Sequence, residues 1–534
     1  MVARSPAMRS ATILVLGTLI SRGAASAQLP DHLRHGAVGR SLSGIAGDTS
    51  ASTLEPRYLE TPLDHFASSG GPTWMLKYFV NDTAFVRGGV IIVTMPSEGP
   101  THGCGASGEV VEKLHAASLC SEHRYFGDSV PFNDSSTAAF EKYLSVEQNL
   151  ADIAALIKHA KSLYPTASAV VVRGGSYAGA SSAWMRRMYP TLVDAAIAQS
   201  PPVTAMYDFA AYDTSNLVAL SSPDSRCAHA QARVAAALTK LLSRQPSKLL
   251  SVFGAPAEYA TSPTGLVDFA YALGDSAASA IQYGRKELLC DALAPMWGGG
   301  QHGGDDTEDD TEPWVLARLF ANYTRRAWGA AYFTGCFYNS SCMATATSGG
   351  TAQSARSWYW MKCAHLGYLQ AAPQDGSLST RPLQLTAKRL MEQCAYIFGA
   401  SAPLLTPARV DAFNRKYGGG TIGGVGRVFV VDYSDDPWKM ATSALAVQRR
   451  AWALSLEQPF MLLTCDGCGH CGAGVPREKE QAIERQALSY LASWGVAPAR
   501  AAADTASPSP RAGNLRSEGG HAASGAVLEA HVST

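Results

Sequence analysis

The sequence predicts an α/β fold whose mostly parallel sheet is interrupted by a long helical insertion. Short apolar, β-branched runs alternate with amphipathic segments up to residue 203, which is typical of parallel strands joined by crossover helices. Similar runs return at residue 427, whereas the tract 204–408 is dominated by alanine, leucine and charged residues at helical spacing. At 534 residues the chain is too long for a single domain.

The charge balance argues against two classes of partner. The chain carries 44 Lys and Arg against 44 Asp and Glu, a formal net charge of +0. A balanced surface offers no general attraction for a nucleic acid or an anionic membrane. We therefore expect neither as a partner, and the oligomeric state, a homodimer included, stays open.

The N-terminus has the three parts of a secretory signal peptide. Arg4 and Arg9 precede the apolar run 11–20, and the small residues at 25–27 provide an A-x-A cleavage site. The apolar run is too short to cross a bilayer, and the alternative of a buried N-terminal helix fits this pattern less well. We predict a signal peptide over 1–27 and a secreted or lysosomal/vacuolar protein.

Three further stretches lack apolar periodicity. Residues 28–54 are rich in Gly, Ser, Ala and Arg, and residues 498–534 are rich in Ala, Ser, Pro and Gly. Such compositions bury too little apolar surface to offset the entropy lost on ordering the chain. We expect a flexible leader, a disordered tail, and a disordered loop in the Gly-rich and acidic stretch 298–312.

Four Asn-x-Ser/Thr triplets and eleven cysteines agree with the secretory route. The triplets predict glycosylation at Asn81, Asn133, Asn322 and Asn339. Most cysteines form disulfides in an oxidising compartment, and the odd number leaves at least one of them without a partner in the chain.

The ordered part of the chain begins near residue 57. Apolar runs predict strands over 74–80, 90–95, 117–122, 169–172, 193–199, 427–432 and 459–464. Ser145 and Gln148 have the spacing of a capping box, and apolar residues at helical spacing extend that helix to Pro165. A last amphipathic helix is expected over 478–494.

A turn between the strand at 169–172 and a helix at 181–189 holds a serine between small residues. Gly174 and Ala178 lie two residues before and two residues after Ser176. A serine at the apex of a strained strand-to-helix turn needs such neighbours, because a larger side chain would clash there. The pattern is that of a nucleophile elbow; an ordinary glycine-rich turn with a solvated serine is the alternative.

Two later loops supply partners for this serine. A serine nucleophile needs a base to remove its proton and an acid to orient the base. In α/β hydrolases the acid and then the histidine follow the serine, each on a loop after a later strand. Asp436 and His470 follow the predicted strands 427–432 and 459–464 in that order.

Both partners have a simpler alternative. Asp436 precedes a proline, where an aspartate commonly makes a structural turn. His470 is otherwise a solvated loop histidine or a metal ligand, since Cys465, Cys468 and Cys471 have zinc-like spacing. An oxidising compartment favours disulfides over zinc, and we expect neither a metal nor a cofactor.

Together these motifs resemble the lysosomal Pro-X carboxypeptidase and dipeptidyl peptidase II family of serine peptidases. The resemblance runs from Tyr58 to Trp494, and its motifs are specific when taken together. They lie at 122–129, at 145–148 with Asp152, and at 174–179, 436–438 and 470–471; the segments 358–370 and 394–399 resemble the insertion of the same family.

The resemblance implies an α/β-hydrolase core with a large helical cap domain inserted between the nucleophile half and the Asp/His half. The core halves are 55–203 and 409–497, and the cap is 204–408. The implied activity is serine-type exopeptidase cleavage, through an acyl-enzyme, of peptides with proline before the scissile bond. Its implied catalytic residues are Ser176 as nucleophile, Asp436 as orienting acid and His470 as base.

Further site residues are expected around this triad. The oxyanion of the tetrahedral intermediate needs hydrogen-bond donors, and we expect them to be the backbone N–H groups of Tyr177 and Gly99. Aromatic faces pack well against a prolyl ring, although such residues are commonly part of the core. The candidates for the substrate pocket are Glu98, Trp358, Tyr368 and Trp438.

Two structural features follow from the same resemblance. Cys363 and Cys394 are expected to form a disulfide within the insertion. Glu122, His123 and Arg124 are expected to form a charged network under the cleft rather than to take part in the chemistry.

Because of three departures from the family pattern, the sequence does not decide which end of a peptide substrate is recognised. Ala178 stands in place of a glycine, residues 432–433 are Asp-Tyr in place of Asn-Gly, and residues 363–365 are Cys-Ala-His in place of Cys-Thr-Glu. Among the possible modes of cleavage we slightly favour a dipeptidyl peptidase over a Pro-X carboxypeptidase and a prolyl endopeptidase. A carboxylester hydrolase on the same fold and a non-catalytic binding protein are the alternatives from other classes.

Overall fold

The computed structural model describes residues 54–68, 70–104, 108–297, 312–347, 350–448 and 456–498. The predicted signal peptide over 1–27, and the leader and tail apart from Leu54 and Pro498, lie outside these residues. The Gly-rich and acidic stretch up to residue 311 also lies outside them.

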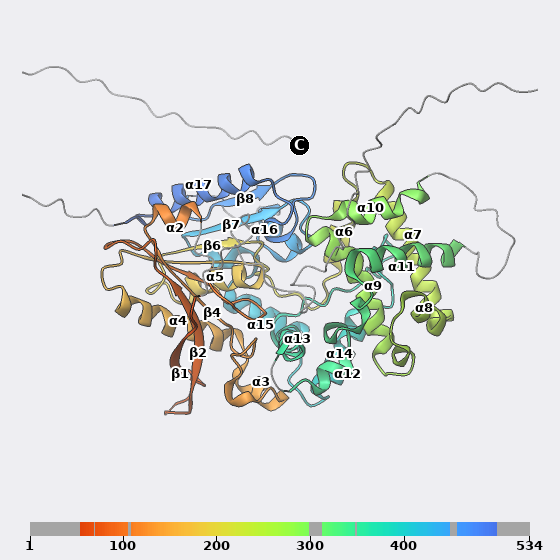
Figure 1. Cartoon of the computed structure of the whole chain (residues 1–534), viewed down its shortest axis with the longest axis horizontal. Helices are drawn as coiled ribbons and strands as arrows, with labels where there is room; N and C mark the ends of the chain where they lie inside the picture. Colours follow the sequence, from red (N-terminus) through yellow and green to blue (C-terminus); the bar gives the residue numbers. More distant parts are fainter. Residues whose placement is uncertain are drawn as a thin grey trace, which may run out of the picture. The chain divides into compact units, whose positions relative to one another are not determined.

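One mixed sheet organises the described chain (Figure 1). The strand order is β1-β2-β4-β3-β5-β6-β7-β8, with β2 antiparallel to both of its neighbours and all other pairs parallel. This order, with the crossover helices between parallel strands, is an α/β-hydrolase fold. The strands are β1 (Arg57–Pro62), β2 (Thr73–Asn81), β3 (Ile91–Thr94), β4 (Ala117–Ser121), β5 (Val170–Gly175), β6 (Ala195–Gln199), β7 (Val428–Tyr433) and β8 (Phe460–Leu463).

Successive side chains of the central strands point to opposite faces of the sheet and pack into two separate hydrophobic cores. Ile92 and Val171 face a cluster that includes residues of α2 (Glu109–Lys113) and α17 (Arg477–Ser493), which contact each other (Figure 1). Val93 and Val172 face the opposite cluster, which contains α4 (Val146–Leu163) and α5 (Ser176–Met188). Both faces of the central parallel strands β5, β6 and β7 are therefore buried, which explains their unbroken apolar runs, whereas the edge strand β8 is partly exposed.

The capping box at the start of α4 is only half as predicted. The Ser145 hydroxyl accepts the backbone N–H of Gln148 at 3.2 Å, as an N-cap should. The Gln148 side chain does not return to Ser145: its amide donates to Asp64 at 2.7 Å, and its oxygen accepts the N–H of His65 at 3.0 Å. The chain before β2 competes for the glutamine, so the reciprocal bond was wrongly predicted.

The chain between β6 and β7 is helical, with no strand among its described residues. A five-residue π-helical segment, Lys362–Leu366, continues α13. The α-helices are α6 (Ala210–Leu220), α7 (Arg226–Arg244), α8 (Pro246–Phe253), α9 (Gly265–Gln282), α10 (Lys286–Leu293), α11 (Glu312–Trp328), α12 (Ser340–Thr345), α13 (Gly350–Met361), α14 (Ala387–Phe398) and α15 (Pro407–Tyr417).

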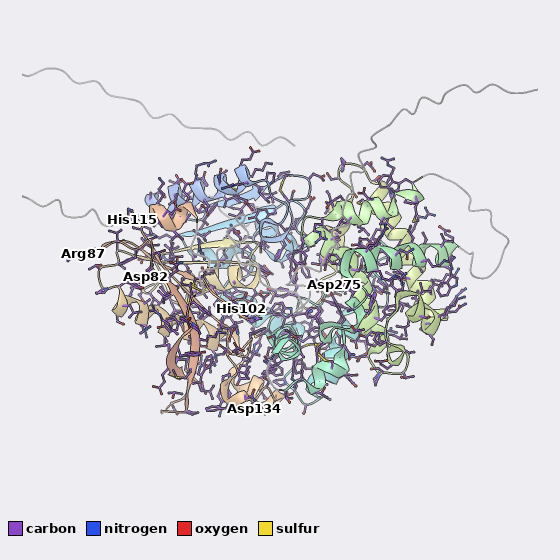
Figure 2. All side chains as sticks on the ribbon, in the orientation of Figure 1. Asp82, Arg87, His102, His115, Asp134 and Asp275 are labelled. Carbon is purple, nitrogen blue, oxygen red and sulfur yellow. A yellow bond between two sulfur atoms is a disulfide. The ribbon has the colours of Figure 1, made fainter. Side chains whose placement is uncertain are left out.

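Polar groups are buried inside this helical segment. Asp275 of α9, labelled in Figure 2, accepts a hydrogen bond from the Tyr338 hydroxyl at 2.9 Å. Lys362 is also buried and donates to the Tyr271 hydroxyl at 3.2 Å. Burial lowers the pKa of Lys362 to about 8, because the charged form has few partners there.

Two helices join the insertion to the sheet half. Ser354 of α13 accepts the backbone N–H of Gly127 at 3.1 Å, and Trp360 donates from its indole to the Leu144 carbonyl at 3.0 Å. The helix α15, which spans the predicted boundary at 408, packs Phe413 against Trp184 of α5 with ring centres 5.3 Å apart.

All eleven cysteines lie in the described residues, and ten of them form disulfides. Cys471 keeps a free thiol. The described part of the chain contains no helix with both the length and the apolar character needed to cross a membrane. The pairs are Cys104–Cys120, Cys227–Cys290, Cys336–Cys342, Cys363–Cys394 and Cys465–Cys468.

Candidate active site

Ser176 occupies the sharp turn where β5 ends and α5 begins. Its φ is 58°, in the left-handed region that residues other than glycine rarely adopt. A Cβ on Gly174 would lie 2.4 Å from the backbone of Ala178, so only glycine fits there. A Cβ on Gly179 would likewise lie 2.6 Å from the Gln199 carbonyl oxygen. The small residues around the serine thus allow a strained turn that keeps its side chain half-buried.

Asp436 follows β7 and makes two contacts with its buried carboxylate. Its Oδ1 accepts the backbone N–H of Trp438 at 2.8 Å, which closes the turn before the 3₁₀ helix Pro437–Ala441. Its Oδ2 lies 2.8 Å from Nδ1 of His470. The structural turn and the histidine contact, which the sequence presents as alternatives, therefore occur together in one side chain.

His470 follows β8 and is almost completely buried. Burial alone would lower the pKa of its imidazole, but Asp436 and Cys471 outweigh this effect and raise it well above the usual value. Its Nε2 has no hydrogen-bond partner among the described residues, so no hydrogen bond joins it to the Ser176 hydroxyl in this structure. Such bonds are commonly long in unliganded enzymes.

The loops that carry Ser176 and His470 are in contact through the adjacent residues. A Cβ on Gly175 would lie 2.9 Å from the sulfur of Cys471, so the histidine loop packs directly on the serine turn. The backbone N–H of Cys471 also donates to the Ser200 hydroxyl at 2.9 Å, just after β6. The loops after β5, β6, β7 and β8 therefore meet at the carboxyl edge of the parallel strands, where α/β sheets bind ligands.

The end of α9 and the start of α10 support the two partner loops. A Cβ on Gly469 would lie 2.4 Å from the carbonyl oxygen of Gln282, so the helix end abuts the histidine loop. Lys286 lies 2.8 Å from Asp435 and 2.5 Å from Asp466, one residue on each loop. One lysine of the helical insertion therefore holds the loops of the acid and the base together.

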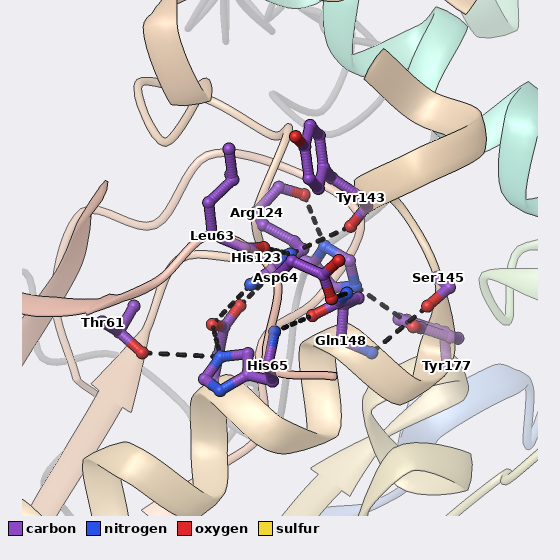
Figure 3. Close-up of polar contacts among 11 residues, drawn as sticks. Thr61, Leu63, Asp64, His65, His123, Arg124, Tyr143, Ser145, Gln148 and Tyr177 are labelled. Carbon is purple, nitrogen blue, oxygen red and sulfur yellow. Dashed lines mark hydrogen bonds and ion pairs between the residues drawn. The ribbon is translucent and has the colours of Figure 1, made fainter. Parts of the chain in front are cut away.

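The side chain of Tyr177, the residue after the serine, contacts His123 (Figure 3). Nε2 of His123 lies 3.1 Å from the Tyr177 hydroxyl, and its Nδ1 lies 2.7 Å from the Arg124 carbonyl oxygen. Burial lowers the pKa of His123 to about 4, so the ring is neutral. Its Nδ1–H must therefore donate to the Arg124 carbonyl, and Nε2 accepts a hydrogen bond from the Tyr177 hydroxyl.

A buried ion cluster adjoins this pair (Figure 3). Arg124 binds Asp152 with two hydrogen bonds of 2.6 and 2.7 Å, and His65 contacts the same carboxylate at 2.7 Å. Burial opposes the charge on Asp152, but Arg124 outweighs it and lowers the pKa of the carboxyl. Glu122 lies 3.5 Å from Lys77 in the same region. Residues 122–124 thus make buried hydrogen bonds and ion pairs close to the serine turn.

Glu98 and Gly99 lie on the loop after β3, and both are buried. Burial raises the pKa of Glu98 to about 8, and a hydrogen bond from its own backbone N–H and the nearby His470 only partly offset this. Its Oε2 has no hydrogen-bond partner among the described residues. A buried acid whose pKa is raised, close to a histidine that is itself paired with an aspartate, is typical of a functional site.

The remaining pocket candidates are aromatic residues in contact with the triad region. The Trp438 ring lies 6.0 Å from His470 and 5.4 Å from the buried Tyr368. The Trp358 ring, from α13, lies 5.9 Å from Tyr177. Trp438 also contacts Phe209, Tyr212 and Gln282. These three residues lie in a tract whose sequence predicts only helices, so no motif marks them as part of the site.

The residues predicted to be glycosylated differ in exposure, and two of the cysteines considered as metal ligands are paired with each other. Asn133 and Asn322 are exposed, Asn81 is half-buried, and Asn339 is half-buried with its side chain capping α12. Cys465 and Cys468 form a disulfide, which removes two of the three cysteines with zinc-like spacing. The described residues contain no group of three or more His, Cys, Asp or Glu that could hold a metal ion.

Comparison with protein families matches residues 61–458 to the model of serine carboxypeptidase S28. The chain belongs to the serine carboxypeptidase S28 family. This S28 protein is therefore a serine peptidase with a hydrolase fold.

Individual relatives share moderate identity with this S28 peptidase. It is 28% identical over 432 residues to "Probable serine protease EDA2" of Arabidopsis thaliana, covering 78% of this chain and 76% of the relative. It is 37% identical over 160 residues to lysosomal Pro-X carboxypeptidase of Homo sapiens, covering 28% of this chain and 32% of the relative. Among solved structures, esterase E22 aligns with 12% identity and a TM-score of 0.34, over 82% of this chain and 100% of the esterase.

Proposed function

We propose that this S28 peptidase hydrolyses the bond after proline near a free terminus of a peptide, with Ser176, His470 and Asp436 as its catalytic triad. The observation that supports this most strongly is the 2.8 Å contact between His470 Nδ1 and Asp436 Oδ2, on a loop that packs against the serine turn. Asp436 fixes the tautomer, so that Nε2 is free to accept the serine proton.

The reaction proceeds in two halves. The Ser176 oxygen attacks the carbonyl carbon of the prolyl residue while its proton moves to His470 Nε2. The tetrahedral intermediate collapses as this proton passes to the leaving amine, which leaves a prolyl ester on the serine. A water molecule then attacks the ester, gives its proton to His470, and releases the acyl product as the proton returns to the serine oxygen.

The oxyanion is stabilised by backbone donors of Tyr177 and Gly99. The N–H groups in the first turn of a helix have no partner within that helix, and Tyr177 is the second residue of α5. Gly99 is buried on the loop after β3, next to β5 in the sheet. Donors fixed in a buried site stabilise a developing negative charge without reorganisation.

Two observations support the proposed preference for proline: the aromatic residues near the triad and the similarity to Pro-X carboxypeptidases. Trp358, Tyr368 and Trp438 place aromatic rings close to the triad, and the half-buried Trp438 has a flat apolar face that suits the rigid pyrrolidine ring. Similar proteins include lysosomal Pro-X carboxypeptidases of Homo sapiens and Mus musculus. We accordingly assign peptides with proline before the scissile bond as substrates.

The proposed setting is the secretory pathway, with a secreted or lysosomal destination. The signal peptide predicted over 1–27, the four glycosylation triplets and the five disulfides all suit an oxidising compartment. We retain the division into core halves 55–203 and 409–497 and cap 204–408, since the described residues between β6 and β7 form no strand.

A panel of chromogenic substrates tests this proposal. Arylamides with proline before the scissile bond should be cleaved at least about tenfold faster than their alanine counterparts, and short acyl esters should be poor substrates. Ser176→Ala should lower kcat by at least about a thousandfold. The matched control is Ser182→Ala in the same helix, where the hydroxyl bonds only the Ala178 carbonyl and activity should be kept.

Two results would overturn the proposal. One is a Ser176→Ala enzyme with wild-type turnover, which would exclude this nucleophile. The other is a wild-type enzyme that hydrolyses esters well and shows no preference for proline.

A further inference from the structure

Asp432, near the end of β7, is a buried acid that the triad contacts described above do not include. Its Oδ2 lies 2.6 Å from Oγ1 of Thr442, and its Oδ1 has no hydrogen-bond partner among the described residues. Both side chains lie in the core, where each residue is 0% exposed. A carboxylate there with only a hydroxyl for a partner would be costly, so the protonation state of this acid needs an explanation.

The contacts of Thr442 indicate where the protons of this pair lie. Its Oγ1 is also 2.8 Å from the carbonyl oxygen of Lys439, and it accepts the backbone N–H of Ala444 at 3.1 Å. A threonine hydroxyl has one proton, so it can donate to only one of its two oxygen neighbours. A carbonyl oxygen has no proton to give. All three contacts are satisfied together only when Asp432 is a neutral carboxylic acid that donates to Thr442, while Thr442 donates to Lys439.

A chain of hydrogen bonds then leads from Asp432 to the acid of the triad. The Thr442 hydroxyl connects Asp432 to the Lys439 carbonyl, within the 3₁₀ helix Pro437–Ala441. The backbone N–H of Lys439 in turn donates to the carbonyl oxygen of Asp436 at 3.3 Å. Asp436 caps the start of this short helix and Thr442 caps its end. Asp432 therefore supports, from the sheet, the helix that begins at the orienting acid.

Burial favours the same protonation state. It raises the pKa of Asp432 to about 8; the nearby charge of Asp436 acts in the same direction, whereas the contact with Thr442, the backbone N–H of Ala444 and the charge of His470 only partly offset burial. The acid is thus neutral in acid and neutral solution and ionised in alkaline solution. Four titratable groups interact with its charge, namely Asp436, Lys439 and Tyr433 on its own chain segment and His470 on the loop after β8.

We propose that Asp432 is a positioning residue of the triad: as a neutral acid it holds, through Thr442, the short helix that fixes Asp436 against His470. The inference rests on the proposed function, which assigns Asp436 the role of orienting acid.

Loss of the proton from Asp432 breaks the chain of hydrogen bonds. The Thr442 hydroxyl then donates to the carboxylate, which leaves the Lys439 carbonyl with only the longer contact of 3.3 Å to the Thr442 backbone N–H. The helix that begins at Asp436 loses its support, and a second negative charge is buried in the same region. Turnover should therefore fall reversibly in alkaline solution, with little change in substrate binding.

The experiment compares kcat of the wild type and of Asp432→Asn between pH 6 and pH 10, with the proline arylamide that the wild type cleaves fastest. Asparagine keeps the shape and can donate from its amide to Thr442, but it cannot ionise. The readout is the ratio of kcat for the variant to kcat for the wild type, because titration of His470 affects both enzymes and cancels. We expect a ratio of about 1 at pH 6 and at least about 10 at pH 10, with KM changed by less than about threefold.

Further variants separate the hydrogen-bond chain from packing. Asp432→Leu has no donor, and Thr442→Val breaks the chain at its next step, so each should lower kcat at least about tenfold at pH 6. Thr442→Ser keeps the hydroxyl and should restore the wild-type kcat. The matched control is Asp268→Asn, at a buried acid of the insertion whose pKa burial raises to about 6; its ratio to the wild type should be the same at pH 6 and pH 10.

Several outcomes would overturn the inference. A ratio for Asp432→Asn that does not rise with pH would do so, as would a wild-type kcat in Asp432→Leu. Loss of kcat in Asp432→Asn at pH 6 would show that a carboxylate, not a donor, is needed there. Wild-type activity that is lost at pH 10 and does not return at pH 6 would also contradict it.

Failure of the proposed function gives a different result. In that case Ser176→Ala retains turnover, or no proline arylamide is cut. If no arylamide is cut, the rate of inactivation by diisopropyl fluorophosphate takes the place of kcat in the same comparison, because it reports the activation of the serine without a peptide substrate.

Discussion

Asp436 contacts His470 with one carboxylate oxygen and closes its own loop with the other. Oδ2 lies 2.8 Å from Nδ1 of the imidazole, and Oδ1 lies 2.8 Å from the backbone nitrogen of Trp438. The loop that positions the acid is therefore stabilised by the same side chain that orients the base. The dual contact also distinguishes this aspartate from its buried neighbour, Asp435, which is bound to Lys286 instead.

Replacement of Asp436 by asparagine should remove catalysis while keeping the fold. Asparagine can still close the loop, but its amide group presents a donor or an uncharged acceptor to His470 and loses the stabilisation of the imidazolium. We expect kcat to fall by about 10³- to 10⁴-fold. The neighbouring Asp435→Asn should lower kcat by less than about tenfold, and equal losses in the two variants would contradict the assignment.

The hydrogen bond between His123 and Tyr177 should contribute to rate without contributing to substrate binding. His123→Leu should allow the tyrosine backbone, and with it an oxyanion donor, to move. We expect kcat to fall by about ten- to a hundredfold, with KM changed by less than about threefold.

A double-mutant cycle checks this coupling. Tyr177→Phe removes the same hydrogen bond from the other side, so the double variant with His123→Leu should be no slower than the worse single variant. Multiplied losses in the double variant would show that the two residues act independently.

Much of the site was predictable because its signals are local. The glycine and alanine around Ser176 are dictated by contacts within a few residues of the turn, such as the 2.4 Å approach of a Cβ on Gly174 to Ala178. The strand before Asp436, β7, is buried on both faces and therefore gives a continuous apolar run, whereas β8 before His470 is a partly exposed edge strand that is apolar all the same. Chain order then limits which loops can meet at one edge of the sheet.

The features that were missed depend on tertiary contacts. β1 is largely exposed and carries no apolar alternation, so only its pairing with β2 makes it a strand. Gln148 was assigned to its own helix cap, but it binds Asp64 and His65, more than 80 residues away. Phe209 and Tyr212 reach Trp438 only because the insertion folds back on the loop after β7. None of these contacts leaves a short-range signal.

Lys286 should make the insertion and the catalytic loops unfold as one unit. Burial would lower the pKa of its ammonium, but hydrogen bonds to Asp435 and Asp466 outweigh this and raise it. Lys286→Met leaves Asp435 buried without its partner, which should cost about 3 kcal/mol of unfolding free energy. The exposed pair Arg226–Asp224 is the control, since Arg226→Met should leave the Tm unchanged. A Tm unaffected by Lys286→Met would refute this role.

Asp152 should stabilise the protein in a way that disappears in acid. Its pKa in the folded chain is lowered by Arg124 and His65, despite burial, from an ordinary value of 3.8. A lowered pKa adds stability that is fully present above 3.8 and is lost as the pH falls through the folded-state value.

Thermal unfolding of Asp152→Asn measures this contribution. The variant leaves Arg124 buried without a counter-charge and should be less stable than the wild type by about 3 to 5 kcal/mol at pH 6. The difference should shrink as the pH falls below about 4, where the carboxyl of the unfolded chain becomes protonated first and that of the folded protein follows at a lower pH. Asp134→Asn, at an exposed position, should show no such dependence. A constant difference for Asp152→Asn from pH 6 to pH 3 would contradict the ion-pair account.

The most direct measurement of the central claim is covalent labelling of the nucleophile. Diisopropyl fluorophosphate reacts with a serine only when a neighbouring base activates it, and peptide mass spectrometry identifies the modified residue. We predict a single adduct, on Ser176, in step with loss of peptidase activity, and at least about a hundredfold slower labelling in His470→Ala. An adduct on another residue with Ser176 unmodified, or inactivation at the wild-type rate in His470→Ala, would contradict the account.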